Sequence, residues 1–180
     1  MKKLFLLVTI VSYTSIAAFS QHDHSSHQQQ TTTSNTDTST KATVTGQTAQ
    51  QFSQLLSSYL NIKNALVTGD ATSAASNADQ FLQTAKSIDN KVIPEGSATI
   101  LSKEAGKISG TKDLKKQREY FVNLSSNMAT VARSFKLSDK PVYMQYCPMK
   151  KASWLSSELQ IRNPYYGSSM LTCGEVTETL

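Results

Sequence analysis

Cysteine and histidine, on which most metal sites and many nucleophilic sites depend, are scarce in this chain of 180 residues. The chain has two cysteines, Cys147 and Cys173, and three histidines, all of which lie within the first 27 residues. The rest of the sequence therefore offers no Cys–His pair and no Ser–His–Asp set for nucleophilic catalysis. The Cys-x-x-Cys motif of thiol–disulfide oxidoreductases is also missing. These absences argue against an enzyme, and we predict none.

Glycine is scarce as well, and no glycine-rich phosphate loop is found among the seven glycines. No apolar run is long enough to cross a bilayer, so we expect a protein that is not membrane-embedded. The 18 basic side chains only mildly outnumber the 13 acidic ones, which gives a net charge of +5. Because this excess is spread along the chain, it favours a solvated surface, and we expect no nucleic-acid partner.

The first twenty residues have the pattern of a secretory signal peptide. Lys2 and Lys3 precede a short apolar stretch, and small residues precede an expected cleavage site near Ser20–Gln21. The mature protein is therefore expected in the periplasm, or secreted. Residues 21–46 are mainly His, Gln, Ser and Thr with almost nothing apolar to bury, and they predict a disordered tail.

Residues 47–180 are the expected folded domain, and apolar residues spaced three or four apart indicate four amphipathic helices in it. Gly69 is expected to end the first helix, and Asp70 is suited to cap the second. A Pro-Glu-Gly sequence separates the second helix from the third, which should end at Gly110. Four such segments joined by short connections predict a mainly all-α fold, an antiparallel four-helix bundle.

The composition changes at Ser138. Three of the four prolines, the only tryptophan and four of the seven tyrosines follow it. Alternation over residues 142–147 indicates a short extended segment, whereas residues 152–159 are interpreted as one or two turns of helix. In the turn-rich sequence at 163–167, Asn163 is expected to stabilise the chain through its own side chain, and Trp154 to anchor the packing. We therefore expect an irregular segment rich in Cys, Met and Tyr after the bundle.

Two short motifs in this segment carry sulfur. They are Cys147-Pro148-Met149 and Met170-Leu171-Thr172-Cys173. Residues two apart in an extended segment face the same side, and residues three apart in a turn also share a face. If the two motifs meet, Cys147, Met149, Met170 and Cys173 can surround one ion, with Met144 as a weaker candidate. Thiolates and thioethers select soft ions such as Cu(I) or Ag(I), whereas a zinc site would use Cys or His in place of methionine.

The same cysteines allow two other interpretations. In an oxidising compartment, a Cys147–Cys173 disulfide would close a loop of about 27 residues and stabilise the fold by about 3–4 kcal/mol. Met149 and Met170 would then fill the core, and the chain would be a structural or interaction module without metal. Alternatively, the two cysteines form a redox couple that binds metal when it is reduced and closes when it is oxidised.

A second group of candidate ligands lies in the tail, where His22, His24 and His27 are close together in sequence. Imidazole suits Cu(II), zinc and nickel, and a flexible segment can wrap around an ion. The tail is therefore a further candidate for metal capture, with a plain polar linker as the alternative.

The chain also resembles a known exported family. The stretches that carry the resemblance are Tyr143-Met144-Gln145-Tyr146-Cys147-Pro148-Met149, Trp154 and 161–176, with Tyr59, Ala65, Leu66 and Asp70 near the start. They are similar to motifs of the family called domain of unknown function 3347, over roughly residues 47–176. That family is helical, and it occurs alone or fused to periplasmic adaptor subunits of copper and silver efflux systems. The resemblance implies a protein accessory to heavy-metal efflux or homeostasis, with an efflux adaptor or a metallochaperone as its partner.

Overall fold

A computed structural model of the protein describes residues 46–88, 93 and 96–180. The signal peptide expected over residues 1–20 and the three tail histidines lie outside the described residues, as does nearly all of the tail expected over 21–46.

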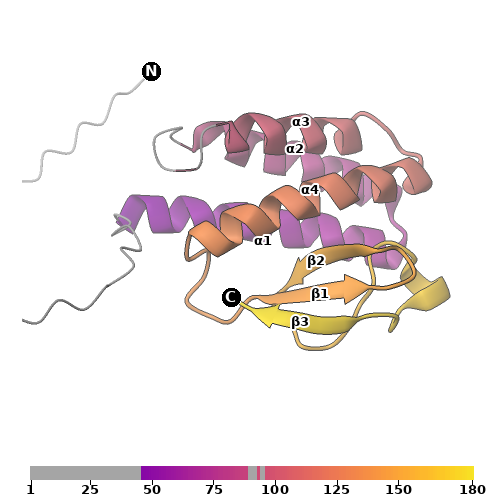
Figure 1. The fold of residues 1–180 in the computed structure, drawn as a ribbon. Coiled ribbons are helices and arrows are strands. Elements are labelled where there is room, and N and C mark those ends of the chain that lie inside the picture. The colour runs from indigo at the N-terminus through magenta and orange to yellow at the C-terminus, as the bar shows by residue number, and fades with distance from the viewer. Residues whose placement is uncertain (1–45, 89–92, 94–95) are drawn as a thin grey trace, which may run out of the picture. The chain divides into compact units, whose positions relative to one another are not determined.

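Four helices form the first part of the described chain (Figure 1). They are α1 (Gly46–Thr68), α2 (Ala71–Ser87), α3 (Ser97–Ser109) and α4 (Leu114–Ser134). Local chemistry sets their ends. Gly69 has a left-handed φ of 79° and follows the last residue of α1. Asp70 caps α2 by accepting a hydrogen bond from the backbone N–H of Ser73, and Asp113 caps α4 in the same way. The four helices predicted from apolar spacing are confirmed.

The apolar stripes of the helices meet in one core. Helix α1 packs on α2, α2 on α3, and α3 on α4. The largest fully buried side chains of the helices include Phe52, Tyr59, Phe81 and Phe121. The prediction of a mainly helical protein is therefore confirmed. No helix in the described part of the chain has both the length and the apolar content needed to cross a membrane.

The C-terminal part contains a three-stranded antiparallel sheet, where the sequence predicted an irregular segment. Strand β1 (Tyr143–Cys147) lies between β2 (Ala152–Ser156) and β3 (Glu175–Thr179) (Figure 1). The extended segment predicted up to Cys147 is confirmed. The helical turn predicted over residues 152–159 is wrong, because pairing with β1 holds residues 152–156 extended and buries most of their side chains.

The sheet is joined to the helices through Tyr59 of α1. The Tyr59 hydroxyl lies 2.8 Å from the Ser125 hydroxyl of α4 and accepts a hydrogen bond from the backbone N–H of Leu155 in β2 at 3.1 Å. The connection from β2 to β3 contains the short 3-10 helix η1 (Gly167–Met170). On the sheet face that carries Gln145, the Gln145 side-chain amide donates to the carbonyl oxygen of Glu158 in this connection at 2.8 Å. Cys147 is the last residue of β1, and Cys173 lies in the connection from β2 to β3. Both cysteines therefore lie outside the four α-helices.

Candidate functional site

The fold brings Cys147 and Cys173 together although 26 positions separate them. Cys147 is the last residue of β1, and Cys173 lies two residues before the start of β3, the strand paired with β1. The two Sγ atoms are 3.6 Å apart, and both cysteines are free. The Cys147 side chain is fully buried, whereas Cys173 is partly exposed. The predicted meeting of the two sulfur motifs thus holds for the two thiols.

Asn163 fixes the backbone around Cys173. This side chain is fully buried, and its Nδ2 donates to the carbonyl oxygen of Cys173 at 2.8 Å. Its Oδ1 accepts from the backbone N–H of Tyr165 at 2.8 Å, and the Asn163 N–H itself donates to the carbonyl oxygen of Leu171. The prediction that Asn163 stabilises the turn through its side chain is confirmed, and the same side chain also holds the segment that carries the cysteine.

Gly174 and Trp154 set the path of the chain directly after Cys173. Gly174 has a φ of 149°, and a Cβ atom at this position would lie 2.9 Å from both the Trp154 ring and the Tyr146 carbonyl oxygen. Glycine is therefore required for the chain to pass so close to the indole. Trp154 is fully buried and lies edge-on to Tyr165 at 5.8 Å, which confirms it as a packing anchor. Gly174 was missed from the sequence, where only its position after a cysteine could have marked it.

The Cys147 thiol affects the protonation of its neighbour Cys173. The pKa of the Cys173 thiol is raised, chiefly by its hydrogen bond with Cys147 and then by burial, while a hydrogen bond with the backbone of Met149 acts in the opposite direction. A raised pKa keeps Cys173 protonated at neutral pH. Because the thiolate is the form that binds metals, any ion that binds here must displace a proton.

Met149 and Met170 lie at the surface beside the cysteines. Their side chains are 63% and 39% exposed. The expectation that they fill the core, which belonged to the disulfide interpretation, is therefore wrong. The backbone N–H of Cys173 donates to the carbonyl oxygen of Met170 at 3.1 Å, which closes the tight turn that the Met-x-x-Cys spacing indicated.

Met144, the weaker candidate, lies elsewhere. It is buried, with 3% of its surface exposed, and it lines a groove between α4 and the sheet. Since neighbouring strand residues face opposite sides, the side chains of Met144 and Cys147, three positions apart, point to different faces of β1. The structure does not bring Met144 to the cysteine pair. Among the described residues, no group of three or more His, Cys, Asp or Glu side chains could hold a metal.

The described chain is thus a mainly helical protein that ends in a small sheet holding a pair of free thiols. Residues 55–140 match the model of a family described as "Protein of unknown function (DUF3347)". The resemblance predicted from the sequence is therefore confirmed. The match ends before β1, so the Cys/Met motifs that also carried the resemblance lie outside the matched residues. Searches of curated proteins and of solved structures gave no significant match.

Proposed function

We propose that this protein binds a soft monovalent metal ion, Cu(I) or Ag(I), through the thiolates of Cys147 and Cys173. The observation that carries this proposal is the 3.6 Å separation of their Sγ atoms. Two sulfurs that bind one ion at about 2.3 Å with a tetrahedral angle lie roughly 3.8 Å apart. The pair therefore needs to open by only a few tenths of an ångström to hold an ion, whereas a disulfide requires the sulfurs to close to about 2 Å.

The surrounding thioethers support the choice of ion. The Tyr166 hydroxyl donates to the carbonyl oxygen of Met149 at 3.5 Å, so the turn that carries Met149 lies beside the start of η1, which ends at Met170. Both methionines are at the surface, where their side chains have room to turn towards the thiols. Sulfur ligands of both kinds favour Cu(I) over hard cations.

The proposed setting is the periplasm, after cleavage near Ser20–Gln21, with a role accessory to heavy-metal efflux or homeostasis. This part of the proposal rests on the sequence pattern of the N-terminus and on the resemblance to the family. A periplasmic efflux adaptor or a metallochaperone is the proposed protein partner. His22, His24 and His27 would add a separate place for Cu(II), because imidazole suits that oxidation state. We propose no enzymatic reaction.

The arrangement of the helices as an antiparallel bundle is also part of the proposal. It is supported by the packing of each helix on the next one in sequence. The short connection at Gly69 and Asp70 between α1 and α2 agrees with it, since short connections join antiparallel neighbours.

The second candidate is a disulfide-closed interaction module without metal. The observation that favours it is again the proximity of two free thiols, which an oxidant can join once the sulfurs close from 3.6 Å to about 2 Å. Mass spectrometry of the protein taken directly from the periplasm separates the candidates. Two free or metal-protected thiols in most molecules support metal binding, and a bonded pair in most molecules supports the module.

The first prediction concerns Cu(I) affinity. The reduced full chain is titrated with Cu(I) against a competing chelator, together with a Cys147→Ser, Cys173→Ser double variant. We expect the double variant to bind Cu(I) at least about 100-fold more weakly. Substitution of a residue that only orients a metal ligand typically lowers metal affinity by about 10–100-fold, and the loss of the ligands themselves should cost at least as much. Met144→Leu is the matched control, since Met144 points away from the cysteines, and it should bind like the unmodified chain. All these proteins carry the same histidine tail, so a difference in affinity between them reports the substituted residues. Equal affinity of the double variant and the unmodified chain would refute the proposal.

A further inference from the structure

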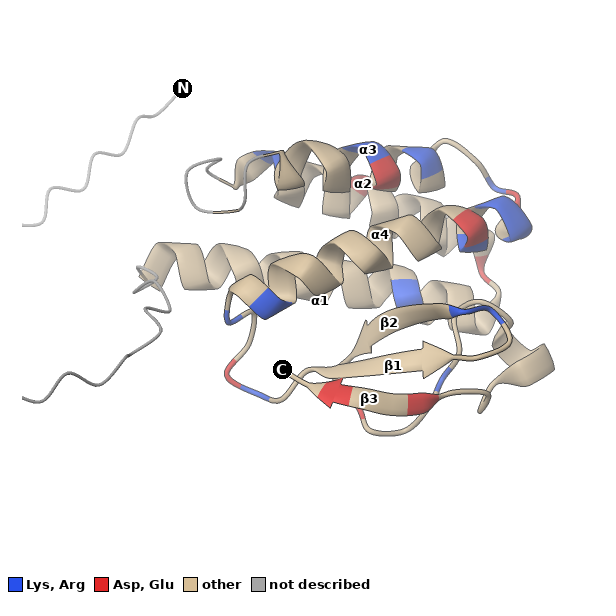
Figure 2. Cartoon of the chain, in the orientation of Figure 1, with Lys and Arg blue, Asp and Glu red and all other residues tan. Residues whose placement is uncertain are grey.

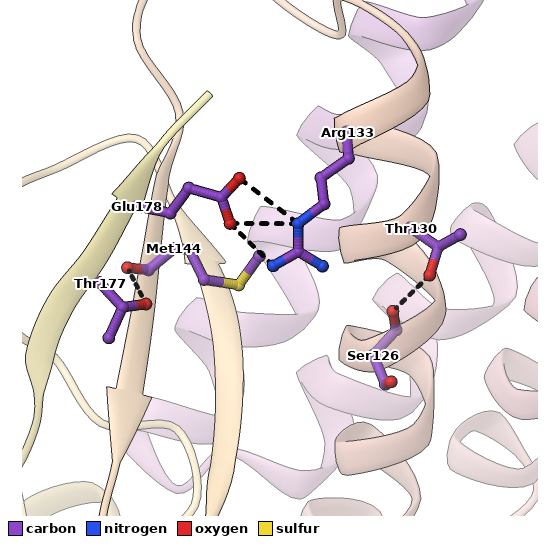
Figure 3. A network of polar contacts seen from close by, with 6 residues as sticks. All are labelled: Ser126, Thr130, Arg133, Met144, Thr177 and Glu178. Atoms are coloured by element: carbon purple, nitrogen blue, oxygen red, sulfur yellow. Dashed lines mark hydrogen bonds and ion pairs between the residues drawn. The ribbon is translucent and has the colours of Figure 1, made fainter.

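A groove of about 300 Å³ lies between α4 and the sheet, on the face of β1 that carries Met144. Ser126, Thr130 and Arg133 line it from α4. Lys151 and Ser153 line it from the β1–β2 hairpin. Figure 3 shows the three α4 residues on one side and Met144 on the other. The volume is at the lower end of the range of small-molecule sites. The groove is separate from the cysteine pair, because Met144 and Cys147 lie on opposite faces of β1.

Arg133 is held at one end of the groove by Glu178 of β3. Its Nη2 lies 2.7 Å and its Nε 3.1 Å from Oε2 of Glu178 (Figure 3). Two of the three guanidinium nitrogens are thereby used, and the ion pair fixes the plane of the group. The third nitrogen, Nη1, points away from Glu178 (Figure 3) and has no hydrogen-bond partner in the described part of the chain. Arg133 therefore retains a free, oriented donor.

The positively charged side chain of Lys151 lines the groove towards its other end. Glu178 pairs with Met144 near the start of β1, whereas Lys151 follows the turn at the end of β1. Lys151 has a φ of 54°, a left-handed conformation that side chains other than glycine rarely adopt. Its backbone N–H donates to the carbonyl oxygen of Cys147 at 2.8 Å, which fixes this turn. Within the described residues, its ammonium group has no ion-pair partner.

Two hydroxyl groups in the groove are hydrogen-bond donors with no acceptor in the described part of the chain. The side-chain hydroxyls of Ser126 and Ser153 have no hydrogen-bond partner among the residues that the structure describes. Glu178, the carboxylate beside the groove, is already engaged by Arg133. Figure 2 shows basic residues at the β1–β2 hairpin turn and acidic residues at both ends of β3. Arg133, Lys151 and Glu178 together carry a net charge of +1, which attracts an anion.

We propose that this groove binds the oxyanion group, a carboxylate or a phosphate, of a small molecule. The anion lies between the Lys151 ammonium and Nη1 of Arg133, and the hydroxyls of Ser126 and Ser153 donate to its remaining oxygen atoms. Met144, Ala129 and Ala152 provide apolar surface for the carbon atoms of the ligand. Hydrogen bonds between ionised partners are the strongest available to such a site.

The test is a titration of the full chain followed by backbone amide NMR shifts at constant ionic strength, with inorganic phosphate in one series and acetate in another. We expect saturable shifts confined to residues 126–133 and 151–153. Lys151→Met should weaken binding by about tenfold, as the loss of a hydrogen bond to a charged group implies. Lys150→Met is the matched control and should leave the affinity unchanged, because Lys150 does not line the groove.

Ser153→Ala provides a second variant that leaves the strained turn intact, and it should also weaken binding. Saturation by phosphate alone identifies a phosphate site, and saturation by acetate alone identifies a carboxylate site. Both results support the proposal. The absence of saturable shifts with either anion would overturn it, and so would an equal loss of affinity in Lys150→Met and Lys151→Met.

Discussion

Cys147 and Cys173 lie next to each other but differ in their access to solvent. Cys147 is fully buried at the end of β1, and Cys173 is partly exposed on the segment that leads to β3. Under the proposed function, an ion that arrives from solvent would therefore meet Cys173 first. Since thiolates exchange ligands through direct contact, an exposed thiol next to a buried one suits both capture and transfer.

The second prediction is a pH dependence at Cys173. Because the pKa of this thiol is raised, the proton is bound at neutral pH and competes with the metal. The apparent Cu(I) affinity should therefore rise with pH, by about tenfold per pH unit for this one proton, and become level above the pKa of the thiol. Chelator competition repeated at several pH values measures this slope. In Cys173→Ser, the part of the pH dependence that comes from this proton should vanish. A Cu(I) affinity of the unmodified chain that does not change with pH would contradict the account.

At the scale of elements, Tyr59 joins two helices and a strand. Its fully buried hydroxyl contacts Ser125 of α4 and accepts from Leu155 of β2, and burial raises its pKa well above the usual value. The Tyr59 ring also stacks on Phe121 of α4 at 5.2 Å. The sheet that carries the cysteines is thus attached to the helices by a buried polar contact as well as by apolar packing.

The third prediction is that Tyr59→Phe destabilises the protein. The change leaves the buried Leu155 N–H without a partner, which costs about 1–3 kcal/mol of unfolding free energy. Urea denaturation measures the effect. Tyr120→Phe is the control, because the Tyr120 hydroxyl makes no hydrogen bond with the described residues, and its loss should stay within about 0.5 kcal/mol. Equal midpoints for the two variants would show that the Tyr59 contact does not hold the sheet.

The helices could be predicted from the sequence because local residues determine them. Apolar spacing, Gly69 and Asp70 all act within a few positions, and they led to nearly correct boundaries for α1 and α2. Strand β2 could not be predicted in this way. Its five residues are too few to show a period, and pairing with β1 decides their conformation.

The candidate site was predicted only in part for the same reason. The Cys-x-Met and Met-x-x-Cys spacings indicated the ligands, but the contacts that bring Cys173 to Cys147 are tertiary. They depend on Asn163, on Gly174 and on the pairing of β3 with β1. The groove at Arg133 left no motif in the sequence, because Arg133 and Glu178 are 45 positions apart.

At the scale of the whole molecule, the helices and the sheet have different relations to the family. The family match covers residues 55–140, which include α2, α3, α4 and the C-terminal part of α1. The sheet that follows carries the cysteine pair on one face of β1 and one wall of the groove on the other. The helices therefore form the core against which the sheet packs. The sheet and its connections supply most of the side chains that we propose bind ligands.

The central claim is that one soft ion is held by the sulfur atoms of both cysteines. X-ray absorption spectroscopy of the full chain loaded with Cu(I) tests it most directly, since it reports the atoms bound to the metal. The account predicts sulfur neighbours at about 2.3 Å, the length typical of metal–thiolate bonds. In the Cys147→Ser, Cys173→Ser variant the number of sulfur neighbours should fall, with nitrogen or oxygen in place of the lost thiolates. A copper environment made only of nitrogen and oxygen in the unmodified chain would contradict the proposal.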